Sequence, residues 1–183
     1  MNYDELNTIL EKHQAWLEGE QADLSGADLS GMDLKDCNLS CANLSNANLN
    51  DCELGYTSLK GCNLRGAELV NANLKGANLE GADLSEANLK DCNLKGVNLS
   101  DCSLCRAKLI HANLKEAKLV DTDLTRADLS HADLRNANLS GTILDETRFN
   151  YADLSGADFS YAKFYTAEIC LSDRRNTKFD KKH

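Results

Sequence analysis

Proline is absent from this chain of 183 residues. Because proline has no backbone N–H group, its absence is typical of a fold in which nearly every N–H donates a hydrogen bond. Aromatic residues make up only 5% of the chain, so small and medium-sized side chains must build the core. No apolar run reaches the roughly 18 residues of a transmembrane helix, and the segment MNYDELNTILEKHQ lacks the apolar stretch of a secretory signal. These absences predict a cytoplasmic protein that does not span a membrane.

Basic residues are too few to balance the acidic ones. The chain has 20 Lys and Arg against 29 Asp and Glu, which gives a formal net charge of −9. The excess lies in residues 1–101, where 17 acids face 7 bases, whereas residues 102–183 hold 12 acids and 13 bases. Direct binding of nucleic acid needs clusters of basic side chains that neutralise phosphates, so a general nucleic-acid binder is disfavoured.

Catalytic motifs are also missing. The sequence contains no Gly-rich phosphate loop, no nucleophile elbow and no HExxH zinc motif. We therefore expect no catalytic residues, no metal ligands and no cofactor, and we predict that the protein is not an enzyme.

The dominant feature of the sequence is a repeat of five residues. From Ala22 it reads ADLSG ADLSG MDLKD CNLSC ANLSN ANLND. A large apolar residue, usually Leu and otherwise Phe or Ile, occupies all 30 fifth positions from Leu24 to Ile169. Two residues before it lies a smaller residue (Ala, Cys, Thr, Val or Met), the residue between them is mostly Asp or Asn, and the last two are variable, polar or Gly.

A period of five fits neither an α-helix nor a β-strand. If two residues of each five point inward, the chain must turn a corner in every unit, and four corners close a square coil. Stacked coils would pair their backbones at about 4.8 Å, the spacing of parallel strands. The large apolar residues then form the core, including one column that repeats at intervals of 20: Leu24, Leu44, Leu64, Leu84, Leu104, Leu124 and Leu144.

The consensus A(D/N)LXX resembles the pentapeptide-repeat family, and the resemblance covers residues 22–171. It implies an all-β solenoid, a right-handed quadrilateral parallel β-helix, and the hand comes from the resemblance alone. We expect an N-terminal α-helical cap at residues 1–21, the β-helix at residues 22–171, and a C-terminal tail or cap at residues 172–183. About eight coils would make a rod about 38 Å long.

The two ends of the repeat differ from its middle. Residues 2–18 place apolar side chains at helical spacing, which predicts a helix that covers the first coil or, alternatively, binds a partner. Arg174 occupies a large apolar position, so the regular coil is expected to end near Leu171. Either the tail folds over the last coil as a cap, or two rods meet end to end here as a homodimer, as in the quinolone-resistance members of the family. The residues predicted at that dimer end are Tyr151, Tyr161, Phe164, Tyr165, Ile169 and Leu171.

Cysteines and histidines raise the question of disulfides and metals. Five of the eight cysteines occupy the small inward position, where Cys acts as a slightly larger Ala, and no two cysteines are 20 residues apart, so we expect free thiols. His111 and His131 are 20 residues apart at an outward position and should stack, with Asp91 before them in the same column. A metal site there would be open and poorly specified, so a solvated column is favoured.

One outward column is basic. Its members share one position at multiples of 20 residues: Lys35, Lys75, Lys95, Lys115 and Arg135. This column is either a solvated face, softened by Asp36 and Glu116, or a stripe that faces an acidic partner. Val70 and Ile110 add a mildly apolar patch on the histidine face, a weaker sign of a protein contact.

Two functional hypotheses follow. The first is a non-enzymatic protein-interaction or structural scaffold that presents a rigid β-helical surface to an unidentified protein partner. The alternative, implied by the family resemblance, is a DNA-mimicking topoisomerase (gyrase) protection protein of the quinolone-resistance type. Duplex DNA of about 38 Å carries roughly 22 negative charges, at one per 1.7 Å. The net charge of −9 is less than half of that, which favours the first hypothesis.

Overall fold

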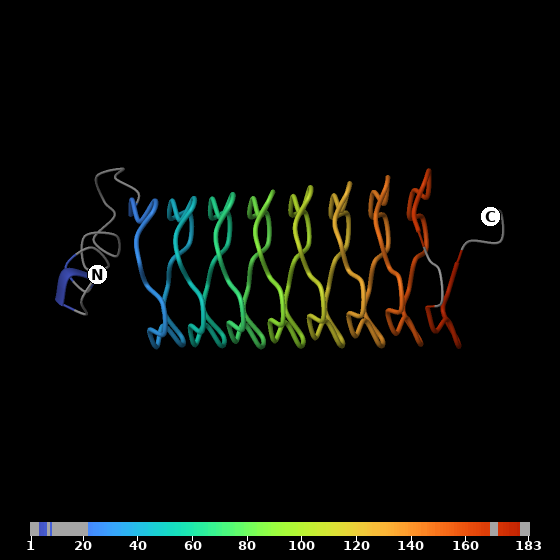
Figure 1. The fold of residues 1–183 in the computed structure, drawn as a ribbon, viewed down its shortest axis with the longest axis horizontal. Coiled ribbons are helices and arrows are strands. Elements are labelled where there is room, and N and C mark those ends of the chain that lie inside the picture. The colour runs from blue at the N-terminus through green and yellow to red at the C-terminus, as the bar shows by residue number, and fades with distance from the viewer. Residues whose placement is uncertain (1–3, 7, 9–21, 169–171, 180–183) are drawn as a thin grey trace.

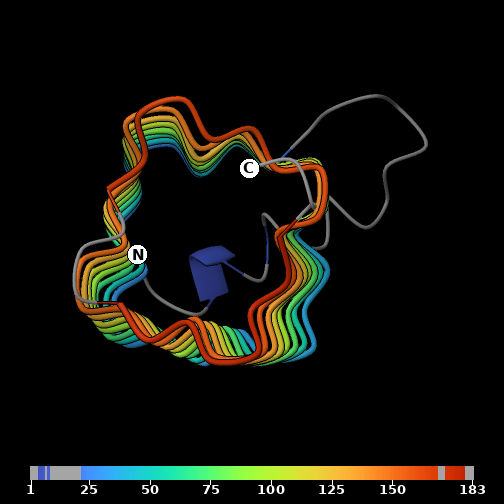
Figure 2. The same cartoon turned by 90° about the vertical axis from the view of Figure 1, so that its right-hand side faces the viewer.

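A single pairing rule organises the chain. The computed structural model describes residues 4–6, 8, 22–168 and 172–179. Within them, the central residue of each five-residue unit forms a parallel bridge to the residue 20 positions later, from Asp23↔Asn43 to Asp158↔Lys178. Each strand is one residue long because a corner follows at once. The coils stack into a rod (Figure 1) with a four-sided outline (Figure 2), so the predicted four-sided parallel solenoid is confirmed.

In a regular unit all five backbone N–H groups donate hydrogen bonds, which agrees with the absence of proline. In the unit 72–76, Asn73, Leu74 and Gly76 donate to carbonyls of neighbouring coils at 2.9, 2.8 and 3.0 Å. The first N–H of the unit closes the preceding corner at 3.0 Å. The remaining N–H, that of Lys75, donates to the side-chain oxygen of Asn73 at 3.3 Å. The side-chain oxygen of the middle residue accepts a hydrogen bond from the N–H group two residues later, as in an Asx turn, which explains why this residue is mostly Asp or Asn.

The second residue of each corner has a left-handed backbone. From Gly26 to Tyr161, and again at Asn176, its φ lies between 53° and 72°. Nine of these residues are glycines, out of 11 in the chain, and 20 carry side chains. Together with the hydrogen bond that closes the corner, this is the type II turn, which requires a positive φ at its third residue.

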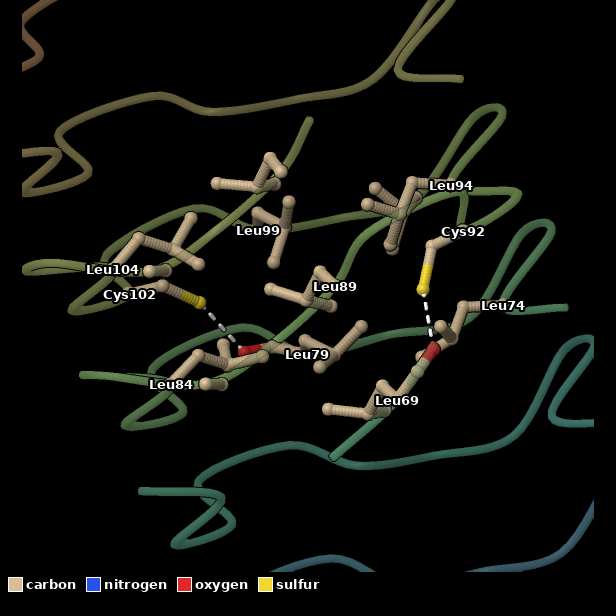
Figure 3. Packing of buried hydrophobic residues seen from close by; sticks show 14 of the residues in the cluster. Leu69, Leu74, Leu79, Leu84, Leu89, Cys92, Leu94, Leu99, Cys102 and Leu104 are labelled. Carbon is tan, nitrogen blue, oxygen red and sulfur yellow. Dashed lines mark hydrogen bonds between the residues drawn. The ribbon is translucent and has the colours of Figure 1, made fainter. Parts of the chain in front are cut away.

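The two inward positions fill the rod with apolar side chains. Leu24 is 1% exposed and the other six leucines of the predicted core column are 0% exposed, so the register assignment is confirmed. Leucines of successive coils lie against one another along the interior (Figure 3). Burying each leucine contributes on the order of 1.5–3 kcal/mol before chain entropy is subtracted.

Cysteine and threonine at the small inward position make a hydrogen bond that alanine cannot make. The Cys92 thiol donates to the Leu69 carbonyl at 2.8 Å, and the Cys102 thiol donates to the Leu79 carbonyl at 2.9 Å (Figure 3). The hydroxyl of Thr57 donates to a leucine carbonyl of the preceding coil in the same way, at 2.7 Å. Each of these carbonyls already accepts the N–H that closes its own corner, so the side chain uses the second lone pair.

The described cysteines are all free, and Cys170 lies outside the described residues. Burial raises the pKa of the Cys62, Cys92 and Cys102 thiols to about 12. These thiols are held protonated and shielded, which agrees with the prediction that the inward cysteines are core residues.

Helical residues lie at the N-terminal mouth of the rod. Residues 4–6 and 8 are helical, and Leu6 is 1% exposed within the same core cluster as the first coil. Seen along the rod, these residues lie within the outline of the coils (Figure 2). Most of the helix predicted over residues 2–18 lies outside the described residues, so the complete capping helix stays a prediction.

Parallel backbone pairing between coils continues at the C-terminal end, beyond the region where leucine fills the large inward position. Asp173 bridges Asp153, and Lys178 bridges Asp158, so the coil register extends past the boundary expected near residue 171. Arg174, at a large apolar position, is exposed to solvent instead of entering the interior. At residues 165–166 the corner is a bend and not the usual turn.

Aromatic rings replace leucines at this end. Phe159 and Phe179 stack with ring centroids 5.4 Å apart, and Phe164 lies 5.7 Å from Phe179. Of the residues predicted at the dimer end, three tyrosines are exposed, Phe164 is half-buried, and two lie outside the described residues: Tyr151, Tyr161 and Tyr165 are 57%, 77% and 72% exposed, and Ile169 and Leu171 are not described.

Candidate interaction surfaces

The predicted basic column runs along one corner of the rod. We call this corner the lysine corner; it consists of residues 35–36, 55–56, 75–76, 95–96, 115–116 and 135–136. Parallel pairing with a step of 20 residues places the first residues of these pairs one above another. The five residues predicted as one column therefore lie on one edge, with Gly55 between the first two lysines.

Ion pairs neutralise both ends of the lysine corner. The Lys35 ammonium lies 3.5 Å from Glu53 and 3.9 Å from Asp33. At the other end, the Arg135 guanidinium donates to both carboxylate oxygens of Asp133, at 2.8 and 2.6 Å. This hydrogen-bonded pair lowers the pKa of Asp133. The charges of the two end cations are therefore already matched by carboxylates of the rod.

The middle of the lysine corner keeps its positive charge. Among the described residues, the ammonium groups of Lys75 and Lys95 make no ion pair, and Lys115 makes only a long one, 3.8 Å from Glu116. The side next to them is uncharged, because an amide ladder runs along it. The Asn93 side chain donates to Asn73 at 2.9 Å, and that of Asn113 donates to Asn93 at 3.4 Å. A short positive band thus lies on a rod of net negative charge.

Tyr56 adds an exposed aromatic ring to the lysine corner. The ring is 64% exposed, and it lies across Gly76 of the next coil. A Cβ at Gly76 would lie 2.6 Å from the ring carbon Cε1, so only glycine leaves room for the ring there. Sequence reasoning missed this contact. The available signal was the spacing, since a large residue precedes a glycine by 20 positions at the same register.

The histidine column forms an exposed stack of rings on another corner. The His111 and His131 centroids are 4.9 Å apart, as predicted, and Tyr151 extends the stack at 4.9 Å from His131 with nearly parallel rings. Val70 and Ile110, on the same corner, are partly buried. No group of three potential metal ligands occurs among the described residues. The column therefore presents a solvated aromatic edge.

A hollow of about 270 Å³ lies on a third corner, lined by side chains of successive coils: Arg65, Ser85, Glu86, Cys105, Arg106, Thr125 and Arg126. Two of its arginines are already paired, because Arg65 donates to Glu86 at 2.7 Å and Arg126 donates twice to Glu146 at 2.8 and 2.9 Å. Burial raises the pKa of the Cys105 thiol, so it is not an activated nucleophile. The hollow is open to solvent, and no histidine lies among its lining residues.

The described part of the chain contains no helix that is long and apolar enough to cross a membrane. The surfaces described above are columns of outward-facing side chains with a fixed spacing.

Comparison with known protein families identifies the same five-residue repeat in this chain. A family model of a pentapeptide repeat region matches residues 32–109, and a family model of eight copies of pentapeptide repeats matches residues 122–160. No curated protein matches the chain.

Several solved structures are similar to the rod. A trypsin-treated form of QnrB1, described as a plasmid-mediated fluoroquinolone resistance protein, is 20% identical over 84% of this chain and 90% of that chain, with a TM-score of 0.55. Full-length QnrB1 is 22% identical over 88% of this chain and 81% of that chain, with a TM-score of 0.53. HetL, a pentapeptide repeat protein involved in heterocyst differentiation regulation from the cyanobacterium Nostoc sp. strain PCC 7120, is 25% identical over 97% of this chain and 94% of that chain, with a TM-score of 0.41. At this level of identity, the likeness to QnrB1 shows the fold alone.

Proposed function

This chain belongs to the pentapeptide-repeat family, and we propose that it is a non-enzymatic scaffold that binds another protein through its outward side-chain columns. The observation that carries the proposal is the uninterrupted pairing from Asp23 to Lys178 with a step of 20 residues. Because each coil is hydrogen-bonded to the next, outward side chains keep fixed spacings over the length of the rod. Such pre-ordering lowers the entropy lost when a partner binds.

Membership of the family and the residues at the two ends of the rod support three more specific parts of the proposal: the hand of the coil, the N-terminal cap and the association of two copies. The right-handed coil is the form that the family adopts. The buried Leu6 supports a helical cap at the N-terminal mouth, and the exposed tyrosines at the other end support end-to-end association of two copies. We place the protein in the cytosol, as its sequence suggests.

Protection of DNA gyrase is the second candidate function; the family resemblance implies it, and QnrB1, which shares the fold of the rod, is described as a fluoroquinolone resistance protein. A protein that imitates duplex DNA must present negative charge along its faces. Here the middle of the lysine corner is positive, and many of the carboxylates are occupied by neighbouring cations, as in the Lys60–Glu80 pair at 2.7 Å. These charges support the scaffold over the DNA mimic.

A supercoiling assay with DNA gyrase separates the two functions. We expect no inhibition, and no protection from a quinolone, when the purified protein is added at low micromolar concentration. A DNA mimic would instead inhibit or protect the enzyme, and salt would weaken the effect because it depends on surface charge. Substituting Lys75, Lys95 and Lys115 by Glu would increase such an effect if mimicry were real. Clear quinolone protection by the unmodified protein would place gyrase protection first.

A further inference from the structure

We infer that the middle of the lysine corner binds a short acidic segment of a partner protein, with Tyr56 as the aromatic anchor. This inference rests on the proposed scaffold function and names the surface and the chemistry of its partner. It is carried by two independent features of the same corner: Lys75 and Lys95 make no ion pair among the described residues, and the Tyr56 ring lies across Gly76.

The charge of this surface is positive while that of the whole chain is negative. Residues 73–78, 93–98 and 113–118 contain four lysines, at positions 75, 95, 115 and 118, and one acid, Glu116. The amide ladder beside them adds no charge. Unpaired cations that are free to meet a partner raise the association rate and select acidic partners. Paired cations at the two ends do not contribute in this way.

The length of the band indicates a short segment and not a nucleic acid. Lys75 and Lys115 are two coil steps apart, about 10 Å. Carboxylates lie beyond both ends of the band, at Glu53 and Asp133. A duplex would carry roughly six charges over 10 Å, at one per 1.7 Å, and would continue into these acidic regions. Three acidic side chains on an extended peptide span about 13 Å, which flexible lysine side chains can reach.

Tyr56 supplies what charge alone lacks, a rigid apolar contact. Exposed surface charges contribute little binding energy one by one, whereas tyrosines are enriched among residues that dominate interfaces. Because the ring rests on Gly76, it has lost part of its freedom before a partner arrives. An acidic segment with an apolar residue beside its carboxylates therefore fits this corner best.

The first test uses fluorescence anisotropy with a labelled hexaglutamate peptide as the probe. We expect binding at low salt that weakens at about 0.3 M salt. The triple variant Lys75→Gln, Lys95→Gln, Lys115→Gln should bind about tenfold more weakly, since each exposed charge contributes modestly. The matched control Lys60→Gln, Lys90→Gln, Lys178→Gln changes the net charge equally on other parts of the surface and should bind within about twofold of the unmodified protein. Equal losses in both triple variants would overturn the inference, because they would mean binding by overall charge.

The second test uses a matched pair of glycines on the same corner, with a hexaglutamate probe that carries one central tryptophan. Gly76 and Gly96 have φ values of 67° and 66°, but a Cβ would meet the Tyr56 ring at Gly76 and nothing within 4 Å at Gly96. Alanine at either site strains the corner alike, and only Gly76→Ala displaces the ring. We expect Gly76→Ala and Tyr56→Ser to weaken binding about fivefold and Gly96→Ala to leave it unchanged. Equal effects of the two alanine variants on binding would show that Tyr56 does not contribute to peptide binding.

Three further results would also contradict the inference. These are the absence of peptide binding by the unmodified protein at low salt, tighter binding of a single-stranded DNA of equal length, and self-association that the lysine variant abolishes. The second would assign the corner to nucleic acid, and the third to another copy of the chain. None of them concerns gyrase, so a failure here is distinguishable from a failure of the scaffold proposal.

Discussion

The middle of the rod and its C-terminal end follow the same five-residue pattern with different side chains. In the middle, the large inward position is always leucine, every corner is a turn, and the leucines are 0–1% exposed. At the end, Phe149, Phe159 and Phe164 take this position, one corner becomes a bend, and Arg174 replaces the large apolar residue. The end also exposes Tyr161 and Tyr165.

This difference indicates that the stability of a coil depends on the coils next to it as well as on its own sequence. A leucine in the middle is covered by coils on both sides, whereas the last coil has a neighbour on one side only. Larger rings compensate in part, since Phe179 covers Phe159 at 5.4 Å. A charged residue is tolerated where the side chain can turn outward, as Arg174 does. Four predictions test this contrast.

The largest effect is expected from a charge in the middle of the rod. Leu84→Asp places a carboxylate in a dry interior without a partner, which should cost more than about 4 kcal/mol and prevent stable folding. The natural Arg174 shows that the equivalent position at the end accepts a charge. Circular dichroism and thermal melting of the purified variant measure the loss.

Ser85→Asp is the control for this substitution. Ser85 is the next residue but points outward at a corner, so its replacement should change stability by no more than about 0.5 kcal/mol. Melting temperatures lowered equally by the two variants would contradict the inward and outward assignment.

High pH should destabilise the rod through the cysteines buried in its middle. Burial raises the pKa of Cys62, Cys92 and Cys102 from 9.0 to about 12. Above pH 9 the unfolded chain loses thiol protons that the folded chain retains, so stability falls as pH rises from about 9 to about 12. Each thiol contributes a slope of about 1.4 kcal/mol per pH unit over this range. Urea unfolding at several pH values measures the slope.

Alanine at the three cysteines provides the control. Alanine already fills most small inward positions, so Cys62→Ala, Cys92→Ala and Cys102→Ala together should preserve the fold and flatten the alkaline part of the curve. An unchanged slope in this variant would show that other groups, such as lysines in ion pairs, cause the alkaline loss.

Much of this architecture could be predicted from the sequence because a strict period leaves few alternatives. The unbroken spacing of Leu24 to Leu144 fixed which residues point inward, and multiples of 20 fixed which outward residues share a column. Stacking of His111 on His131 followed from the same arithmetic. Where local spacing determines neighbours, one-dimensional reasoning is sufficient.

Other features depend on details that spacing does not contain. The left-handed corner residue could have been recognised from the nine glycines at one register, but the 20 other residues there hid the requirement. The lysines appeared equivalent because their ion pairs depend on side-chain reach, which pairs Lys35 and leaves Lys75 unpaired. The role of Tyr56 was missed because its ring occupies the space that a side chain at position 76 would fill, and Gly76 has no side chain to signal the contact.

The exposed tyrosines test whether the end of the rod is a cap or a contact between two copies. We expect the unmodified protein to be a dimer in solution and the double variant Tyr161→Glu, Tyr165→Glu to be mainly monomeric. Charges would replace aromatic rings that are 77% and 72% exposed in the single chain, and repulsion between copies would follow. Light scattering over a range of concentrations measures the mass. A monomeric unmodified protein at high concentration would favour the cap, and Asp36→Ser, an exposed position near the other end of the rod, serves as the control.

The smallest effect concerns the corners, where the middle of the rod has a regular turn. Arg106 has a φ of 60°, a conformation that costs a residue with a side chain energy and costs glycine none. Lys75 lies at the first corner position, where φ is not positive. Neither side chain makes an ion pair among the described residues. Replacing either residue by glycine therefore mainly reports the conformational preference of the backbone at that position. We expect Arg106→Gly to be neutral or to stabilise the rod by up to about 1 kcal/mol, and Lys75→Gly to destabilise it by roughly 0.5–1 kcal/mol. Urea unfolding resolves a difference of this size when both midpoints are compared at equal slope. Equal shifts in the two variants would mean that the left-handed corner costs the side chain nothing, and that the glycines at this register serve contacts such as that of Tyr56 and not the turn itself.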